Sequence, residues 1–226
     1  TKRNRSKEEI RSNKQNQIPE NWQKVNIGQY VNVVLGGTPA KSNNEYWGGD
    51  IKWLTIVQSI VLFGTGIVFP FYIIFINKIG ANFTQFGIAY ALFALSSVFV
   101  HKLIGGYSDQ FGRKIFLLIN SWGVAVLFLL FPLATNIYQV YFLQTILGIF
   151  GAMQKTSEKA IVADFTDGEE RGKKIGKYHA WIAIFSALAV IAGGYIIDML
   201  TLEVIFYIGS LILFISGLLI LKIKEK

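Results

Sequence analysis

The chain has 226 residues, of which 52% are apolar and 16% are charged, and its mean hydropathy is +0.43. A soluble domain of average composition carries about a quarter of its residues as charges, so this balance argues against an ordinary soluble protein. The sequence contains no cysteine, which excludes disulfides and thiolate metal sites.

The first 54 residues differ from the rest, since they hold 14 of the 36 charged side chains. Residues 1–17 are expected to be disordered or a frayed helix. Residues 18–54 are expected to be irregular or partly β, and their segments IPENW and GGTPAKSNNEYWGGDIKWL resemble the start of a target-recognition domain in the DNA-specificity subunit of type I restriction enzymes. A fragment this short buries too little surface to fold alone, so DNA binding is not expected from it.

From residue 55 onward, long stretches without Asp, Glu, Lys or Arg alternate with short charged clusters. About 20 apolar residues are needed for a helix to cross the hydrocarbon of a bilayer. The pattern therefore predicts an all-α membrane domain over 55–226. Its six expected transmembrane helices lie at 55–77, 83–104, 115–134, 137–156, 176–197 and 203–222.

The basic residues predict the orientation of these spans. With the N-terminus in the cytoplasm, 21 of the 22 Lys and Arg residues fall on the cytoplasmic side, and Lys78 is the exception. Cytoplasmic loops are enriched in Lys and Arg, so both termini are expected to be cytoplasmic. Most of the net charge of +8 then serves as an orientation signal and does not require a nucleic-acid partner.

The segment GGYSDQFGRK, residues 105–114, separates the second and third expected spans. Gly112 suits a turn with positive φ, and Gly105 would let a neighbouring helix approach closely. Arg113 and Lys114 would anchor the third span at the interface. Asp109 could cap a helix or pair with a cation.

The pattern G-x-x-x-D-x-x-G-R-K at this position resembles the loop signature of the major facilitator superfamily of secondary transporters. Asp164 and the Arg171-Gly172 pair after the fourth span also resemble that family. The resemblance implies a conformational gate at the cytoplasmic face. By position, the gate group would comprise Gly105, Asp109, Gly112, Arg113, Lys114, Asp164 and Arg171, whereas Gln110 departs from the basic residue usual there.

Few polar residues occur inside the expected spans. Four of them could line a transport cavity or could equally form hydrogen bonds between helices, namely Gln58, Tyr90, Asn120 and Gln144. Near the end of the fourth span, Lys155, Glu158 and Lys159 are expected to be interfacial and paired with one another. His101 is interpreted as part of an interfacial anchor rather than a proton relay.

The resemblance implies transport of an unidentified small solute by one six-span half in the cell membrane, with a homodimer or a separate second half completing it. No catalytic residue, cofactor or metal site is predicted, so the chain is not expected to be an enzyme. Two alternatives remain at this stage, a DNA-specificity fragment fused to membrane sequence and a membrane protein that transports nothing. Membrane fractionation, and flux with a partner half supplied, would separate them.

Overall fold

The computed structural model describes residues 51–166 and 170–223, and every element within them is helical. The predictions for 1–17 and for 18–50 lie outside the described residues. Residues 51–54, assigned above to the polar fragment, instead form the first turn of a membrane helix that begins at Ile51. That boundary was wrong because Trp53 and Leu54 continue the apolar pattern of the span, and Leu54 is fully buried.

The described elements, in chain order, are α3 (Ile51–Gly66), η2 (Phe69–Phe71), α4 (Tyr72–Lys78), α5 (Phe83–Phe111), α6 (Arg113–Leu130), η3 (Phe131–Leu133), α7 (Ile137–Phe165), α8 (Arg171–Met199) and α9 (Leu202–Ile220). Three of these helices, α5, α7 and α8, are 29 residues long. They exceed the roughly 20 residues that span a bilayer.

The first expected span is continuous in sequence but broken in structure. α3 ends at Gly66, a single 3₁₀ turn follows over Phe69–Phe71, and α4 resumes the direction of the span. Pro70 lies at the start of the 3₁₀ turn, where it has no N–H to donate to the preceding turn. The sequence predicts one span here, and the proline divides it into two helical pieces.

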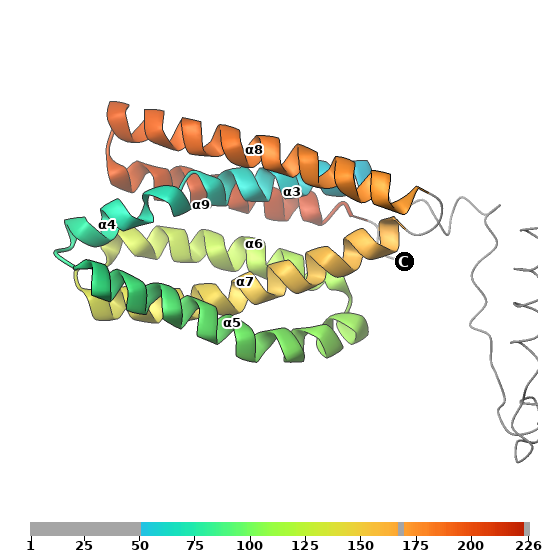
Figure 1. The fold of residues 1–226 in the computed structure, drawn as a ribbon, viewed down its shortest axis with the longest axis horizontal. Helices are drawn as coiled ribbons and strands as arrows, with labels where there is room; N and C mark the ends of the chain where they lie inside the picture. Colours follow the sequence, from blue (N-terminus) through green and yellow to red (C-terminus); the bar gives the residue numbers. More distant parts are fainter. Residues whose placement is uncertain (1–50, 167–169, 224–226) are drawn as a thin grey trace, which may run out of the picture. The chain divides into compact units, whose positions relative to one another are not determined.

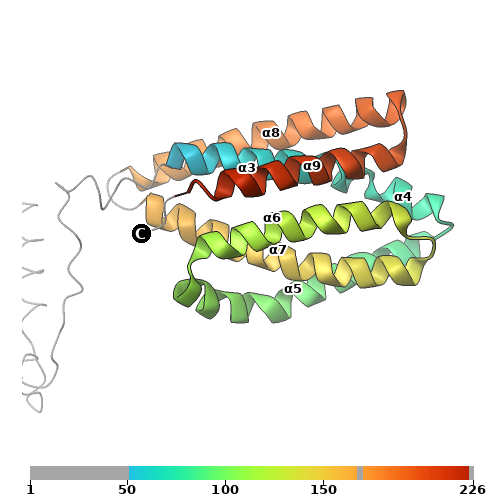
Figure 2. The ribbon, with the colours of Figure 1, turned by 180° about the vertical axis from the view of Figure 1, so that it is seen from behind.

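The helices pack in a repeating arrangement (Figure 1). α5 packs on α7 as α3 packs on α8, and α6 packs on α7 as α3 packs on α9. The first three spans are α3–α4, α5 and α6, and the last three are α7, α8 and α9. When the two sets are exchanged in order, the α5–α7 contact becomes the α8–α3 contact and the α6–α7 contact becomes the α9–α3 contact. This equivalence is the pattern of a structural repeat. α6 and α9 also pack together and lie at the back of the bundle, as the reverse view shows (Figure 2).

Two glycines allow the closest helix approaches. A Cβ at Gly148 of α7 would overlap the carbonyl oxygen of Phe93 and the side chain of Ser96, both on α5. A Cβ at Gly193 of α8 would lie 2.7 Å from the carbonyl oxygen of Ile67. Small residues let backbones approach in membrane helix pairs, so these positions determine how closely α5–α7 and α3–α8 pack.

An aromatic cluster fills the core at one end of the bundle. Phe206 of α9, which is fully buried, lies with its ring centroid 5.2 Å from that of Phe75 and 5.6 Å from that of Phe131. Tyr72 and Phe128 complete the cluster. We call these five rings the aromatic end. Beside it, Lys78 of α4 forms an ion pair with Glu203 of α9.

Within the described residues, five helical segments are long and apolar enough to cross a membrane. They are Ile51–Lys78, Phe83–His101, Arg113–Leu133, Arg171–Met199 and Leu202–Ile220. α7 is not among them, because Gln139, Gln144 and Gln154 lower its hydropathy. The predicted all-α membrane class is confirmed, with five candidate spans among the described residues. A count of six requires that α7, which packs inside the bundle, also crosses the membrane.

Candidate functional site

The loop between α5 and α6 brings three of the predicted gate residues together. The Arg113 guanidinium donates hydrogen bonds to the Asp164 carboxylate, to Asp109 Oδ1 at 3.2 Å and to the carbonyl oxygen of Ala160 at 2.8 Å. Arg113 thus joins the end of α5 to the last turns of α7. We call Asp109, Arg113 and Asp164 the latch.

The other gate residues have different surroundings. Gly112 has a φ of 91°, which confirms the predicted turn between α5 and α6. The Lys114 ammonium donates to the carbonyl oxygens of Leu221 at 2.6 Å and Ile223 at 2.8 Å, so it holds the end of α9. Arg171 is an exposed residue at the start of α8, and no hydrogen bond or ion pair joins it to another described residue.

The expected close helix approach at Gly105 was wrong for the described residues. No atom of another side chain or helix lies within 4 Å of the position that a Cβ would take there. The glycine lies on the partly exposed side of α5, away from the α5–α7 contact made at Gly148.

Two of the four expected cavity residues lie inside the bundle and share one hydrogen-bonded chain. Asn120 of α6 donates to Gln154 of α7 at 2.8 Å, and Gln154 donates to Gln58 of α3 at 2.7 Å. Gln58 and Asn120 are 1% and 3% exposed, so they join three helices and do not line an open surface. Gln154 was not predicted, since its position ten residues after Gln144 places it about 80° away around α7.

The remaining two expected cavity residues differ in exposure. Gln144 is buried, with 3% of its surface exposed, whereas Tyr90 is 60% exposed. The Tyr90 ring stands in a row along α5 with Phe86 and Phe93, at centroid distances of 6.4 and 6.0 Å. Of the four, only Tyr90 is available to a molecule outside the bundle as it stands.

The charged residues near the end of α7 do not pair as expected. The Glu158 carboxylate accepts a hydrogen bond from the buried hydroxyl of Tyr178 on α8, at 2.5 Å. Lys155 and Lys159 are exposed, and neither forms an ion pair with Glu158 or with any other described residue. The predicted mutual pairing was therefore wrong, because Tyr178 turns the carboxylate toward α8.

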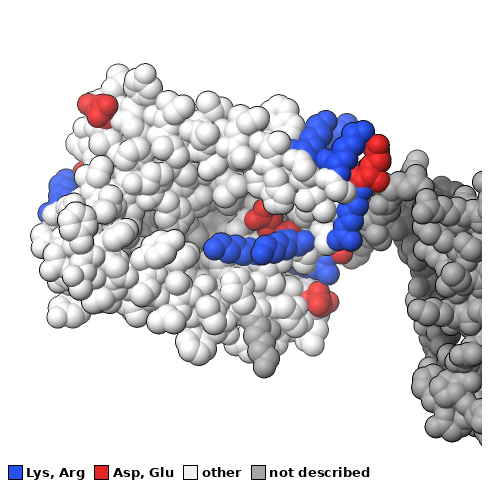
Figure 3. Space-filling view, viewed as in Figure 1, with Lys and Arg blue, Asp and Glu red and all other residues white. Residues whose placement is uncertain are grey.

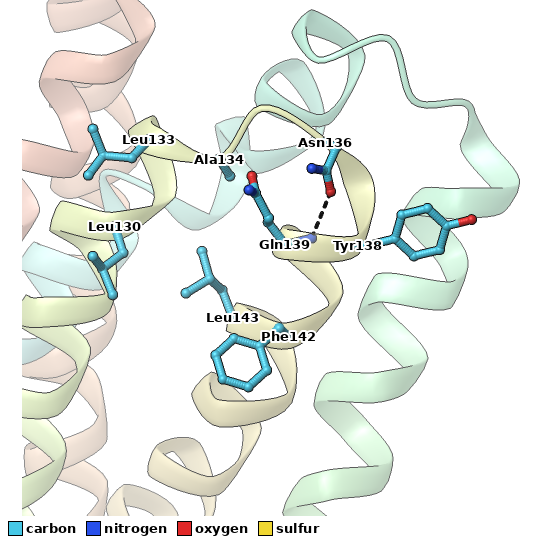
Figure 4. A pocket seen from close by; sticks show the side chains of 8 residues that line it. All are labelled: Leu130, Leu133, Ala134, Asn136, Tyr138, Gln139, Phe142 and Leu143. Carbon is cyan, nitrogen blue, oxygen red and sulfur yellow. Dashed lines mark hydrogen bonds between the residues drawn. The ribbon is translucent and has the colours of Figure 1, made fainter.

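Two hollows formed by the described residues bear on the candidate site. One, of about 210 Å³, adjoins the latch and is lined by Ser108, Asp109, Gly112, Arg113, Ile161, Asp164 and Phe165. The other, of about 650 Å³, is open and mostly apolar, and it lies between η3 and the start of α7 (Figure 4). There Asn136 accepts a hydrogen bond from the Gln139 amide and caps α7, and the Gln139 side chain accepts from Thr135, so these polar groups serve the helix end.

A bundle of long apolar helices with an ionic latch at one end defines a membrane protein of the transporter class. The chain belongs to the Major Facilitator Superfamily, whose family model matches residues 54–226. The predicted resemblance of residues 18–54 to a restriction-enzyme specificity subunit is not supported by these similarities, and Leu54 already belongs to the matched range.

Two relatives illustrate the family membership. The MFS-type transporter YitZ of Bacillus subtilis (strain 168) is 49% identical over 162 residues, which cover 72% of this chain and 99% of YitZ. The multidrug resistance protein MdtG of Salmonella arizonae is 28% identical over 174 residues, which cover 75% of this chain but 42% of MdtG. The chain therefore spans nearly all of one relative and less than half of the other.

Proposed function

We propose that this chain forms one six-span half of a secondary transporter that moves a small solute across the cell membrane by alternating access. The observation that carries the proposal is the latch. A single guanidinium bridges the end of α5 and the last turns of α7.

The latch is suited to reversible opening. The Asp164 and Asp109 side chains are 50% and 66% exposed, while Arg113 is 24% exposed. Exposed ion pairs contribute at most about 1 kcal/mol each, so water can replace these contacts at a small cost. One arm of the contact network usual in the family is missing, since Gln110 replaces a basic residue.

Orientation and span number complete the proposal. α7 is the fourth span, because Gln144 is buried and Gln154 forms hydrogen bonds with Asn120 of α6 and Gln58 of α3, while Gln139 lies at the helix start. The latch end and both termini face the cytoplasm, in agreement with the positive-inside rule. Figure 3 supports this orientation, since basic side chains gather at one end of the described bundle and leave a wide uncharged belt.

A second bundle completes the transport path. Family members enclose their substrate between two halves, so a second copy of this chain or a separate partner half would complete the path. The MdtG relatives are named for multidrug resistance, so drug-like organic molecules are the first solutes to assay.

The latch can be tested without knowing the solute. The sequence lacks cysteine, so Ser108→Cys introduces a single thiol into the latch hollow. We expect slow labelling of this thiol by a maleimide in the wild-type background and several-fold faster labelling when Asp164→Asn is added. Leu133→Cys, at the opposite end, should not respond to Asp164→Asn. Equal labelling of Ser108→Cys in both backgrounds would rule out the latch as a gate.

The orientation has its own test. In intact cells, a membrane-impermeant maleimide should label Asn77→Cys, an exposed position in the last turn of α4, and should not label Lys222→Cys. The reverse pattern would contradict the proposed topology.

A further inference from the structure

One face of the bundle carries two lysines, Lys155 and Lys159, that form no ion pair with any other residue of 51–166 and 170–223. α5, α7 and α8 lie at the front of the view in Figure 1, with α6 and α9 behind them. Lys155 and Lys159 are exposed on α7, four residues apart. Figure 3 shows basic side chains reaching from the charged end over a hollow in this face.

Hydrogen bonds to neighbouring helices show where the two lysines stand. Thr156 faces α5, where its hydroxyl lies 2.8 Å from His101 Nδ1. Glu158 faces α8, where it binds Tyr178. On a helix with 3.6 residues per turn, positions 155 and 159 fall between these two directions. The two ammonium groups therefore lie between α5 and α8, on the side of α7 that no described helix covers.

The only carboxylate next to them in sequence cannot neutralise both lysines. Tyr178 is 1% exposed, and its hydroxyl holds Glu158 against α8. Like charges four residues apart repel each other on a helix. An anion between the two ammonium groups would remove this repulsion.

The position of Lys155 along α7 places it near the membrane surface at the latch end. It lies eighteen residues after Ile137, the first residue of α7, which corresponds to about 27 Å along the helix. The hydrocarbon is about 30 Å thick. Both lysines therefore lie where α7 leaves the hydrocarbon, within reach of water, of a dissolved anion and of lipid headgroups.

We infer that Lys155 and Lys159 bind the anionic group of a small solute on the face between α5 and α8. The inference rests on the proposed transport function and adds a substrate class to it, carboxylate or phosphate-bearing molecules. His101 and Tyr178 border the site from either side. A phosphate group of a lipid offers the same chemistry, and the experiment separates the two sources.

The experiment uses the full chain in phosphatidylcholine nanodiscs at constant ionic strength, with radiolabelled inorganic phosphate and malonate as probes and tetraethylammonium as the cationic control. We expect saturable binding of at least one anion and none of the cation. Lys155→Gln should weaken anion binding about tenfold or more, as expected for the loss of a charge-assisted contact. Lys155→Arg should retain most of it. Lys174→Gln, an exposed lysine at the start of α8, should bind as the wild type does and controls for net charge.

A second arm identifies the source of the anion. Nanodiscs that also contain phosphatidylglycerol are examined by native mass spectrometry. If the wild type retains this lipid, Lys155→Gln does not, and the lipid displaces the labelled anions, the site holds a lipid headgroup. If the labelled anions still bind, the ligand is a free solute.

Two results would overturn the inference. One is anion binding that is absent, or unchanged by Lys155→Gln, in both kinds of disc. The other is carbodiimide cross-linking of Lys155 to an acid of a second copy, which would make the lysines part of an interface. If the Ser108→Cys labelling still responds to Asp164→Asn, the transport proposal stands and only the anion site fails. If that response is also absent, both fail.

Discussion

The two ends of the bundle are held together by different kinds of contact. At the aromatic end, buried rings from α4, α6, η3 and α9 pack within about 6 Å of one another, with centroids 5.2 to 6.3 Å apart. At the latch end, partly exposed charges join α5, α6 and α7. Close packing is lost all at once when helices separate, whereas exposed ion pairs exchange readily with water. If the proposed alternating access holds, the latch end is the part expected to open while the aromatic end stays assembled.

The largest expected effect comes from breaking the aromatic end. Phe206→Ala removes a fully buried ring that contacts Phe75, Phe128 and Phe131. We expect a loss of about 3 kcal/mol or more in the free energy of unfolding, measured by denaturation in mixed micelles. Phe83→Ala is the matched control, since that ring is 73% exposed. Similar losses in both variants would show that the cluster is not the stabilising core.

The next largest effect should come from the contact between α5 and α7 at Gly148, which lies between the aromatic end and the latch end. Gly148→Ala places a methyl group against the backbone of α5 at Phe93. We expect destabilisation of about 1–3 kcal/mol from overpacking, in the same denaturation assay. Gly87→Ala on α5 has no atom within 4 Å of its new methyl group and should be neutral or slightly stabilising. A neutral Gly148→Ala would mean that α5 and α7 can separate without cost.

A smaller effect on stability is expected from the latch itself. Arg113→Gln removes the contacts to Asp109 and Asp164, and we expect a loss of about 1 kcal/mol or less because these carboxylates are well exposed. The labelling rate of Ser108→Cys should nevertheless rise several-fold. A large loss of stability without faster labelling would make Arg113 a structural residue rather than a gate.

The smallest effect should come from the ion pair beside the aromatic end. Lys78 and Glu203 are 56% and 29% exposed, so their coupling should be below about 1 kcal/mol and should weaken in salt. A double-mutant cycle with Lys78→Gln and Glu203→Gln measures it. A coupling energy well above that value would show that the stability of the aromatic end also depends on charge.

Much of the fold could be predicted from the sequence, because the spacing of charges fixes where helices can lie in a membrane. The expected spans 83–104 and 176–197 fall within α5 and α8. The break at Pro70 was not predicted, although the proline was visible, because the residues around it are as apolar as a continuous span requires. The full lengths of α5, α7 and α8 were also missed, since polar residues at a helix end carry no hydropathy signal.

The candidate site could be predicted only in part. Sequence positions identified Asp109, Arg113 and Asp164, which the fold brings together. The amide chain from Asn120 through Gln154 to Gln58 depends on helix rotations that a single sequence does not fix. The same holds for Glu158, whose choice of Tyr178 over the neighbouring lysines depends on how α8 packs against α7.

The length of α5, α7 and α8 has a consequence for the surrounding membrane. Each helix exceeds the span of the hydrocarbon by about nine residues, or about 13 Å. With the aromatic end fixed at the opposite surface, bilayer thickness determines how far the latch projects into water. Coulomb attraction strengthens as the dielectric constant falls. The ion pairs of the latch should therefore be stronger in a thicker bilayer and weaker in a thinner one. Lipid chain length would then change how readily the proposed gate opens.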